Sequence, residues 1–348
     1  MGVTMAVIGA GYWGPNLVRN IAFDPSAELR WVCDLDAARA HKLASTFSGA
    51  QATAQIDQVL SDPLVDAVAI ATPASTHAEL AIRALRSGKH VLIEKPLASS
   101  AADAERMIAV AEEEGRVLMC DHTYCYTPAV RCIRQLIDAG ELGDVLFVDS
   151  VRINLGLVQP DVNVIWDLAP HDLSILDFIL PAGQRVLTVA AQEADPIHAG
   201  QACVGYLTLE LSGGAIAHIH VNWLSPTKVR TLMVGGSRRM VVWDDMNAAQ
   251  RVAVYDRGVD LRPAGPDEMR RRNLSYRLGD MVAPALPTGE ALSQVIAEFA
   301  AAVRGESRPV TDGRAGLRIL RILEAAGRSK TSGGTAVAID HLSPAVAA

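Results

Sequence analysis

The sequence predicts an α/β chain in two parts, with a parallel sheet in the first part and an open, mainly antiparallel sheet in the second. In the first part, strand and helix patterns alternate over roughly 120 residues, as in a parallel sheet covered on both faces. A glycine-rich turn directly follows the first strand. In the second part, short alternating strands recur with tight turns between them, which is typical of an antiparallel sheet. We therefore predict two domains, residues 1–121 and 122–348.

Composition excludes several classes of function. The 348 residues are 50% hydrophobic and carry a net charge of −7, so the chain can bury a sizeable core and favours small-molecule chemistry over nucleic acid or acidic membrane surfaces. The sequence has neither a signal-peptide pattern nor an apolar run long enough for a membrane span, so we expect a soluble, cytoplasmic protein. Its five cysteines lack CxxC spacing, so we predict neither a disulfide framework nor a metal site.

The glycine-rich turn joins a short apolar strand, Val3–Ile8, to an amphipathic helix. The turn has the pattern G-x-G-x-x-G and consists of Gly9, Ala10, Gly11, Tyr12, Trp13 and Gly14. Between a strand and a helix, such glycines permit a tight turn and let the backbone approach a pyrophosphate at the helix N-terminus. The pattern predicts a dinucleotide-binding site.

A carboxylate at the expected distance strengthens this prediction. The second strand, Leu29–Cys33, ends at Asp34, which lies 20 positions after Gly14. An acid at this spacing accepts hydrogen bonds from the adenosine ribose and repels a 2′-phosphate. The sequence therefore favours NAD, while Asp36 and Arg39 nearby leave NADP possible. The alternative interpretation is a glycine turn followed by an incidental aspartate.

The remaining elements of the first part keep the alternation. They are helices Ala37–Phe47 and Ile56–Leu60, strand Ala67–Ala71, a helix that starts at Ser75 or Thr76 and closes at Gly88, strand His90–Glu94, helix Ala101–Glu114 and strand Val117–Cys120. Ligands of parallel sheets bind outside the carboxyl ends of the strands. Thr72, Pro73, Glu94 and Lys95 all follow or end such strands, so we expect Lys95 beside a nicotinamide.

Lys95 is the first candidate for chemistry. It stands at the mouth of an apolar strand, and Pro96 stops that strand because proline has no N–H for a sheet. An amine that is partly desolvated at such a position is suited to proton exchange. The alternative is an ordinary surface turn that closes the strand.

The second part combines strands with a few helices. We predict helices Thr127–Ala139, Leu292–Val303 and Gly313–Ser329, strands Val145–Leu155, Val186–Gln192, Cys203–Leu211, Ala215–Asn222, Lys228–Val234, Met240–Trp243 and Val252–Tyr255, a polar loop Arg262–Arg277, and a short tail from Gly333. His218 and His220 fall on one face of their strand, where packing or solvation explains them better than metal ligation.

A second candidate site lies between these strands. Asp167 and His171 are four positions apart, so both face one point if the segment is helical. Histidine exchanges protons near neutral pH, and a carboxylate beside it fixes its tautomer and orientation. A capping or surface pair is the alternative.

These motifs together resemble the glucose-fructose oxidoreductase/inositol dehydrogenase (Gfo/Idh/MocA) family. The resemblance covers nearly the whole chain and is carried by the glycine turn, Ala71-Thr72-Pro73 with Thr76-His77, Gly88 to Pro96, and Asp167 with His171. It implies an N-terminal Rossmann domain and a C-terminal α/β domain whose open sheet forms the contacts of a homodimer or homotetramer. It also implies a cis peptide bond between Lys95 and Pro96.

The resemblance also implies roles for the site residues. His171 is the general base or acid toward a sugar hydroxyl, Lys95 polarises that oxygen and relays protons, and Asp167 positions them, while hydride passes between the sugar carbon and the nicotinamide. The implied cofactor contacts are Gly9, Gly11, Tyr12, Trp13, Gly14, Asp34, Thr72, Pro73, His77, Glu94, Lys95 and Trp166.

Polar residues near the second candidate site suggest the substrate class. Those placed to line a substrate cleft, together with His171, are Tyr124, Tyr126, Arg152, Asn154 and Asn163. They resemble the family members that act on nucleotide-linked sugars. Arg152 suits a carboxylate or phosphate, or else it is buried and paired within the sheet. A free-sugar or inositol dehydrogenase, and a non-catalytic nucleotide-binding sensor, are the alternative functions.

Overall fold

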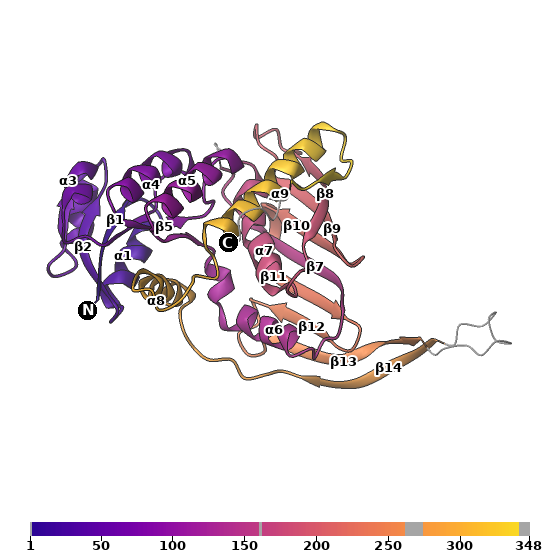
Figure 1. Ribbon diagram of the computed structural model, residues 1–348. Coiled ribbons are helices and arrows are strands. Elements are labelled where there is room, and N and C mark those ends of the chain that lie inside the picture. The colour runs from indigo at the N-terminus through magenta and orange to yellow at the C-terminus, as the bar shows by residue number, and fades with distance from the viewer. Residues whose placement is uncertain (1, 160–161, 262–273, 341–348) are drawn as a thin grey trace. The chain divides into compact units, whose positions relative to one another are not determined.

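The computed structural model describes residues 2–159, 162–261 and 274–340 of the chain (Figure 1). These residues form two compact units. Unit 1 comprises the chain up to Thr127 together with Gly289–Glu324, and unit 2 comprises Pro128–Thr288 and the chain from Ala325 onward. One sheet is parallel and the other is mainly antiparallel, so the predicted fold class is confirmed.

Unit 1 is built on a six-stranded parallel sheet with the order β3-β2-β1-β4-β5-β6. Its strands are β1 (Val3–Ile8), β2 (Ala27–Cys33), β3 (Gln51–Thr53), β4 (Ala67–Ile70), β5 (His90–Glu94) and β6 (Leu118–Asp121). The register sets the carboxyl ends level, since the paired residues include Ile8 with Cys33 and Ile70, Ile70 with Ile93, and Ile93 with Cys120. The segments that leave these strands therefore start along one edge.

Helices cover both faces of this sheet. They are α1 (Gly14–Phe23), α2 (Ala37–Ala44), α3 (Ile56–Ser61), α4 (His77–Arg86), α5 (Ala101–Glu113) and α8 (Ala291–Val303), with short 3₁₀ turns η1 (Ala74–Thr76) and η2 (Thr123–Tyr126). Helices α4 and α5 pack together, as do α1 and α8 (Figure 1). Because the strand order reverses between β1 and β4 while the crossovers keep one hand, the two halves send their helices to opposite faces.

The segment that returns to unit 1 closes its β6 edge. The Cys120 amide donates to the Thr311 carbonyl at 2.8 Å, and the Tyr126 hydroxyl donates to Oε1 of Glu298 at 2.9 Å. Helix α9 (Gly313–Thr331) then begins in unit 1 and ends in unit 2. Among the residues described, no helix is long and apolar enough to cross a bilayer.

Unit 2 contains a nine-stranded sheet with the order β14-β13-β12-β11-β7-β10-β9-β8-β15. Its strands are β7 (Val145–Leu155), β8 (Val186–Ala194), β9 (Val204–Leu211), β10 (Ile216–Asn222), β11 (Leu224–Gly236), β12 (Met240–Asp244), β13 (Val252–Leu261), β14 (Leu274–Val282) and β15 (Val337–Ala338). Strands β7 and β10 pair in parallel, and the other pairs are antiparallel. Helices α6 (Pro128–Asp138) and α7 (Val164–Ile179) pack on this sheet.

The sequence missed part of this sheet. Residues 274–277 belong to β14, so the predicted loop is wrong there, while residues 262–273 lie outside the described part of the chain. Strand β13 continues six residues beyond the predicted Tyr255, because it pairs along its length with β14. Such a ladder is a long-range pairing that local composition does not reveal.

The face of the sheet bearing Tyr206 carries the two strand histidines. The ring of Tyr206 stacks on His220, with ring centroids 4.4 Å apart, and His218 lies beside it at 6.1 Å. The prediction that both histidines share one face is therefore confirmed, and their surroundings are aromatic packing.

Helix α7 is fastened to β7 by a buried ion pair. Nε of Arg152 lies 2.6 Å from Oδ2 of Asp172, and these residues are 3% and 2% exposed. Ser150 donates a further hydrogen bond of 2.8 Å to Oδ1 of Asp172. Arg152 is therefore buried and paired, as the second interpretation expected, but its partner lies on helix α7 and not within the sheet. The contact of Arg152 with substrate stays a prediction.

Removing one partner of this pair leaves the other charge buried without its counter-ion, so the stability contribution of the pair can be tested. We expect Arg152→Met to lower the free energy of unfolding by about 3–5 kcal/mol. The double variant Arg152→Met/Asp172→Leu removes both charges and regains most of that loss. Urea unfolding followed by near-ultraviolet circular dichroism measures both.

The control for this test is the surface pair of Arg83 and Asp57, whose side chains are both exposed. We expect Arg83→Met to leave the unfolding midpoint nearly unchanged. Equal losses for Arg83→Met and Arg152→Met would contradict the role given to the buried pair.

Candidate active site

The glycine turn of unit 1 has the form that a dinucleotide requires. Gly9 has φ +99°, and a Cβ there would lie 2.6 Å from the Ala71 carbonyl oxygen. A Cβ on Gly14 would collide with the carbonyl of Gly9, whereas one on Gly11 would meet nothing within 4 Å. The first and last glycines are thus needed for the turn and for helix packing, and the middle one leaves open space into which a phosphate fits.

Asp34 is held against this turn. Its Oδ2 accepts a hydrogen bond of 2.7 Å from the Ala10 amide, and its Oδ1 accepts one of 2.9 Å from the Asp36 amide. Nη1 of Arg39 lies 3.4 Å from Oδ1, on a side chain that is half exposed. The carboxylate is therefore fixed where an adenosine ribose would lie, and Arg39 is the neighbouring cation that could meet a 2′-phosphate.

His77 connects two of the segments at the sheet edge. Its buried ring places Nδ1 2.9 Å from the Pro96 carbonyl and Nε2 2.9 Å from the Thr72 carbonyl. Burial lowers the pKa of this imidazole, although both carbonyls favour its protonated form. Both ring nitrogens face backbone, so His77 ties these two segments together, and its contact with the cofactor stays a prediction.

Thr72, two residues after the end of β4, is half-buried and keeps surface for a ligand. Its hydroxyl lies 2.7 Å from that of Thr76, and its methyl group lies close to Gly9. Pro73 and Tyr12 are exposed beside the same edge, and Trp13 is half-buried. These predicted cofactor residues therefore gather around the glycine turn of unit 1.

The strand that carries Lys95 ends as the resemblance implied. Glu94 is the last residue of β5, and the Lys95–Pro96 peptide bond is cis. The Glu94 carboxyl faces Asp121, the last residue of β6, which the sequence analysis used only as a domain boundary. Burial, and then Asp121, raise the pKa of Glu94 well above its ordinary value. Asp121 is thus a candidate that sequence reasoning missed, and its place at the end of a neighbouring strand was the signal that could have found it.

In unit 2 the segment with Asp167 and His171 is helical, which is the condition under which both residues face one point. Helix α7 is capped by Asn163, whose Oδ1 accepts a hydrogen bond of 3.0 Å from the Trp166 amide. Asp167 and His171 lie one turn apart on this helix and are both half-buried. The predicted geometry of the pair is thus present within unit 2.

A tryptophan that sequence reasoning overlooked holds the carboxylate of this pair. Nε1 of Trp223 donates to Oδ2 of Asp167 at 3.2 Å, and Trp223 is 2% exposed. Its backbone is fixed as well, since its carbonyl accepts from the Gly156 amide at 2.9 Å and its amide donates to the Cys203 carbonyl at 2.9 Å. Asp167 therefore accepts a hydrogen bond from a residue whose backbone is fixed at the end of a strand.

The predicted substrate residues fall into two groups, those whose side chains bond within the fold and those that keep exposed surface. Asn163 caps α7 and donates from Nδ2 to Glu193 at 2.9 Å, and Tyr126 is buried with its hydroxyl on Glu298. Both side chains are thus used inside the fold. Tyr124 and Asn154 are half-buried, as is Trp166, so these three keep surface for a ligand.

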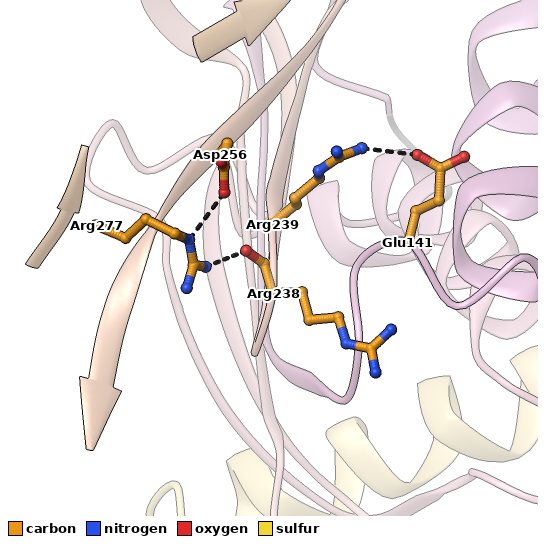
Figure 2. Close-up of a pocket in the computed structure, with 5 residues that line it drawn as sticks. All are labelled: Glu141, Arg238, Arg239, Asp256 and Arg277. Atoms are coloured by element: carbon orange, nitrogen blue, oxygen red, sulfur yellow. Dashed lines mark hydrogen bonds and ion pairs between the residues drawn. The ribbon is translucent and has the colours of Figure 1, made fainter. Parts of the chain in front are cut away.

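A charged pocket of about 440 Å³ lies elsewhere in unit 2, and none of the predicted site residues line it (Figure 2). Nε of Arg277 donates to Asp256 at 2.8 Å, and Arg239 donates to Glu141 at 2.9 Å. Arg277 also donates to the backbone carbonyl of Arg238 (Figure 2). These pairs tie β13 and β14 to neighbouring turns, which indicates a structural network.

Comparison with known proteins agrees with the two-part organisation. The profile of an oxidoreductase family with an NAD-binding Rossmann fold matches residues 3–122, and the profile of the GFO/IDH/MocA C-terminal domain matches residues 130–242. The chain belongs to the Gfo/Idh/MocA family. It is an NAD(P)-dependent oxidoreductase that acts on a CH–OH group, and its relatives act on sugars and inositols.

Two curated relatives and two solved structures indicate the range of this family. The chain is 29% identical to UDP-N-acetylglucosamine 3-dehydrogenase of Acidithiobacillus ferrooxidans over 90% of its own length and 93% of the relative. It is 41% identical to dTDP-3,4-didehydro-2,6-dideoxy-alpha-D-glucose 3-reductase of Streptomyces violaceoruber over 47% and 50%. The structure of the Acidithiobacillus enzyme matches with TM-score 0.80, 26% identity and coverage of 95% and 98%. GenD2 from gentamicin A biosynthesis, solved with NAD, matches with TM-score 0.80, 26% identity and coverage of 98% and 97%.

The carboxylate at the end of β2 gives a test of cofactor choice. We expect Asp34→Ser to weaken NAD binding about 10-fold to 100-fold, because it removes a charged acceptor for ribose hydroxyls, and to strengthen NADP binding. The double variant Asp34→Ser/Arg39→Ala should lose the gain for NADP. Titration of intrinsic fluorescence with each cofactor measures these changes, and an unaltered NAD to NADP ratio in Asp34→Ser would contradict the assignment.

The indole of Trp223 gives a second test. Trp223→Phe keeps an aromatic ring but removes the hydrogen bond to Asp167, so we expect kcat to fall about tenfold or more with little change in KM or in NAD affinity. Trp243→Phe, at a second tryptophan buried in the same sheet, is the matched control. Equal losses in both variants would assign Trp223 to packing alone.

Proposed function

We propose that this chain is an NAD-dependent dehydrogenase or ketoreductase of a nucleotide-linked sugar. The observation that carries the proposal is the pair of Asp167 and His171 on one turn of α7, with the Asp167 carboxylate oriented by Trp223. A fixed carboxylate beside a histidine is the arrangement that proton transfer to or from a hydroxyl requires. Lys95, at the end of β5, supplies the third group of the proposed machinery.

The proposed roles follow from the chemistry of these groups. During oxidation, His171 takes the proton of the sugar hydroxyl, and during reduction it returns that proton. Asp167 keeps the imidazole oriented, and Lys95 of unit 1 is the group proposed to polarise a substrate oxygen. The glycine turn, Asp34 and Thr72 of unit 1 would hold the dinucleotide. When bound, the nicotinamide supplies or accepts the hydride.

The nucleotide-linked substrate class is supported by two relatives, of which one spans nearly the whole chain and the other about half of it. UDP-N-acetylglucosamine 3-dehydrogenase aligns over nine-tenths of both proteins, and the dTDP-sugar 3-reductase has the higher identity over half of its length. Both names place the reaction at sugar carbon 3. We therefore propose C3 of a UDP- or dTDP-linked sugar as the reacting carbon. Tyr124, Asn154 and Trp166 are the residues proposed to contact this substrate or the cofactor.

A free-polyol dehydrogenase is the second candidate. Inositol 2-dehydrogenase 2 of Saccharopolyspora erythraea is 30% identical over 64% of this chain and 67% of that enzyme. A non-catalytic sensor is less well supported, because Lys95, Asp167 and His171 are all present. We also propose a homodimer or homotetramer, since the face of the unit 2 sheet with Tyr206 also exposes Ile216 and Met233; sedimentation equilibrium would give its mass.

Substrate class is tested with a panel of UDP-sugars, dTDP-sugars, free sugars and inositols, assayed in both directions by the absorbance of reduced nicotinamide. We expect turnover only when the nucleotide is present. Turnover of free polyols at equal kcat/KM would replace the proposal with the second candidate. NAD binding without turnover of any compound would support the sensor.

The role of the histidine is tested by His171→Asn, for which we expect kcat to fall about 10²-fold to 10⁴-fold, because a general base is lost. His198→Asn is the matched control, since His198 is exposed in unit 2 and has φ +57°, a conformation that asparagine accepts readily. An activity of His171→Asn close to that of the control would contradict the assignment.

A further inference from the structure

Unit 1 contains a pair of carboxyl groups that the roles above do not use. Glu94 ends β5 and Asp121 ends β6, and the two residues are direct partners in the parallel register. Side chains of paired residues on adjacent parallel strands project to the same side of the sheet. The register therefore sets the two carboxyls side by side at the strand ends, and the neighbouring Asp121 raises the pKa of Glu94 further than burial alone does.

One oxygen of each carboxyl in this pair is buried. Asp121 is 1% exposed, and Oε1 of Glu94 and Oδ2 of Asp121 are both buried. Among the described residues, no N–H or O–H donates to either of these two oxygens. The Thr123 hydroxyl donates to the other oxygen of Asp121 at 2.8 Å, which favours Asp121 as the ionised member.

Other titratable groups face the pair from β5, β6 and the segment after β6. Lys95 is the neighbouring cation of Glu94, and Cys120, Cys125 and His122 complete the surroundings. Burial lowers the pKa of His122 to about 4 and raises the pKa of Cys120 well above its usual value. Near neutral pH, therefore, neither of these two groups changes charge.

Two carboxylates in contact cannot both stay ionised in a buried site, because their repulsion is barely screened there. We propose that Glu94 and Asp121 share one proton at neutral pH, and that Asp121 is a positioning residue that keeps the Glu94 carboxyl protonated toward the nicotinamide half of the bound dinucleotide. Strands β4 to β6 form the half of a Rossmann sheet that binds the second mononucleotide of a dinucleotide. Glu94 is the last residue of β5 and so lies at the carboxyl end of this half. The proposal goes beyond the proposed function, since it concerns the cofactor and needs no substrate.

The shared proton makes cofactor binding depend on pH in a defined direction. Oxidised nicotinamide carries a positive charge and the reduced form does not, so loss of the shared proton strengthens binding of NAD relative to NADH. The ratio of the NADH to the NAD dissociation constant should therefore rise with pH. One coupled proton sets the upper limit of this rise at about tenfold per pH unit.

The experiment measures both dissociation constants by fluorescence and calorimetry across the pH range in which the protein stays folded. We expect the ratio to rise with pH in the unaltered protein. It should stay flat in Asp121→Asn and in Glu94→Gln, because each variant leaves only one carboxyl of the pair, which then has no second carboxyl with which to share a proton. Glu79→Gln, at an exposed acid on α4, should behave as the unaltered protein. A flat ratio in the unaltered protein, or a slope that persists in both variants, would overturn the proposal.

A direct measurement guards against variants that fold poorly. Infrared difference spectra of the unaltered protein, recorded on raising the pH, should show the loss of one protonated carboxyl band from a buried site. Labelling of glutamate with ¹³C assigns that band to a glutamic acid. Absence of a protonated glutamic acid at neutral pH would overturn the proposal whatever the variants do.

Discussion

The site in unit 1 depends on the register of a parallel sheet. The hydrogen bonds between β1, β2, β4, β5 and β6 bring their last residues level, so that Gly9, Asp34, Ala71, Glu94 and Asp121 all start from one edge. No side chain has to be guided to that edge individually, because the backbone ladder does this for all strands at once. The glycine turn, Asp34 and the strand end at Glu94 and Lys95 are thereby gathered from segments that are far apart in the sequence.

In unit 2 a single helix positions the candidate residues. Helix α7 is held at three strands: Asp172 pairs with Arg152 on β7, Asn163 bonds Glu193 on β8, and Asp167 accepts from Trp223 directly after β10. A helix fixed at three points has little freedom to slide or turn. The positions of Asp167 and His171 therefore depend on contacts of residues with no proposed chemical role. Two of these supporting residues, Arg152 and Asn163, were predicted from the sequence as substrate contacts.

Electrostatics distinguishes the two kinds of acid in this protein. Asp34 and Asp167 each accept hydrogen bonds from N–H donors, as does Asp172 from Arg152, so these carboxylates are matched by donors or cations. Glu94 and Asp121 face each other instead, and burial with this contact raises the pKa of Glu94. Acids matched by donors serve orientation, whereas a like-charge contact is a place where a proton is held.

The sequence by itself determined the class of both sheets, the glycine turn with Asp34, the Glu-Lys-Pro strand end and the spacing of Asp167 and His171, because each of these is written in local periodicity or in a short motif. Only the tertiary structure decided that Arg152, Tyr126 and Asn163 are used within the fold, that Trp223 serves Asp167, and that Asp121 meets Glu94. It also decided that residues 289–324 return to unit 1 and that β14 extends the second sheet. The physical reason is that pairing, burial and charge matching join residues tens to hundreds of positions apart, and no local pattern encodes which polar side chain finds its partner inside the protein and which is left for a ligand.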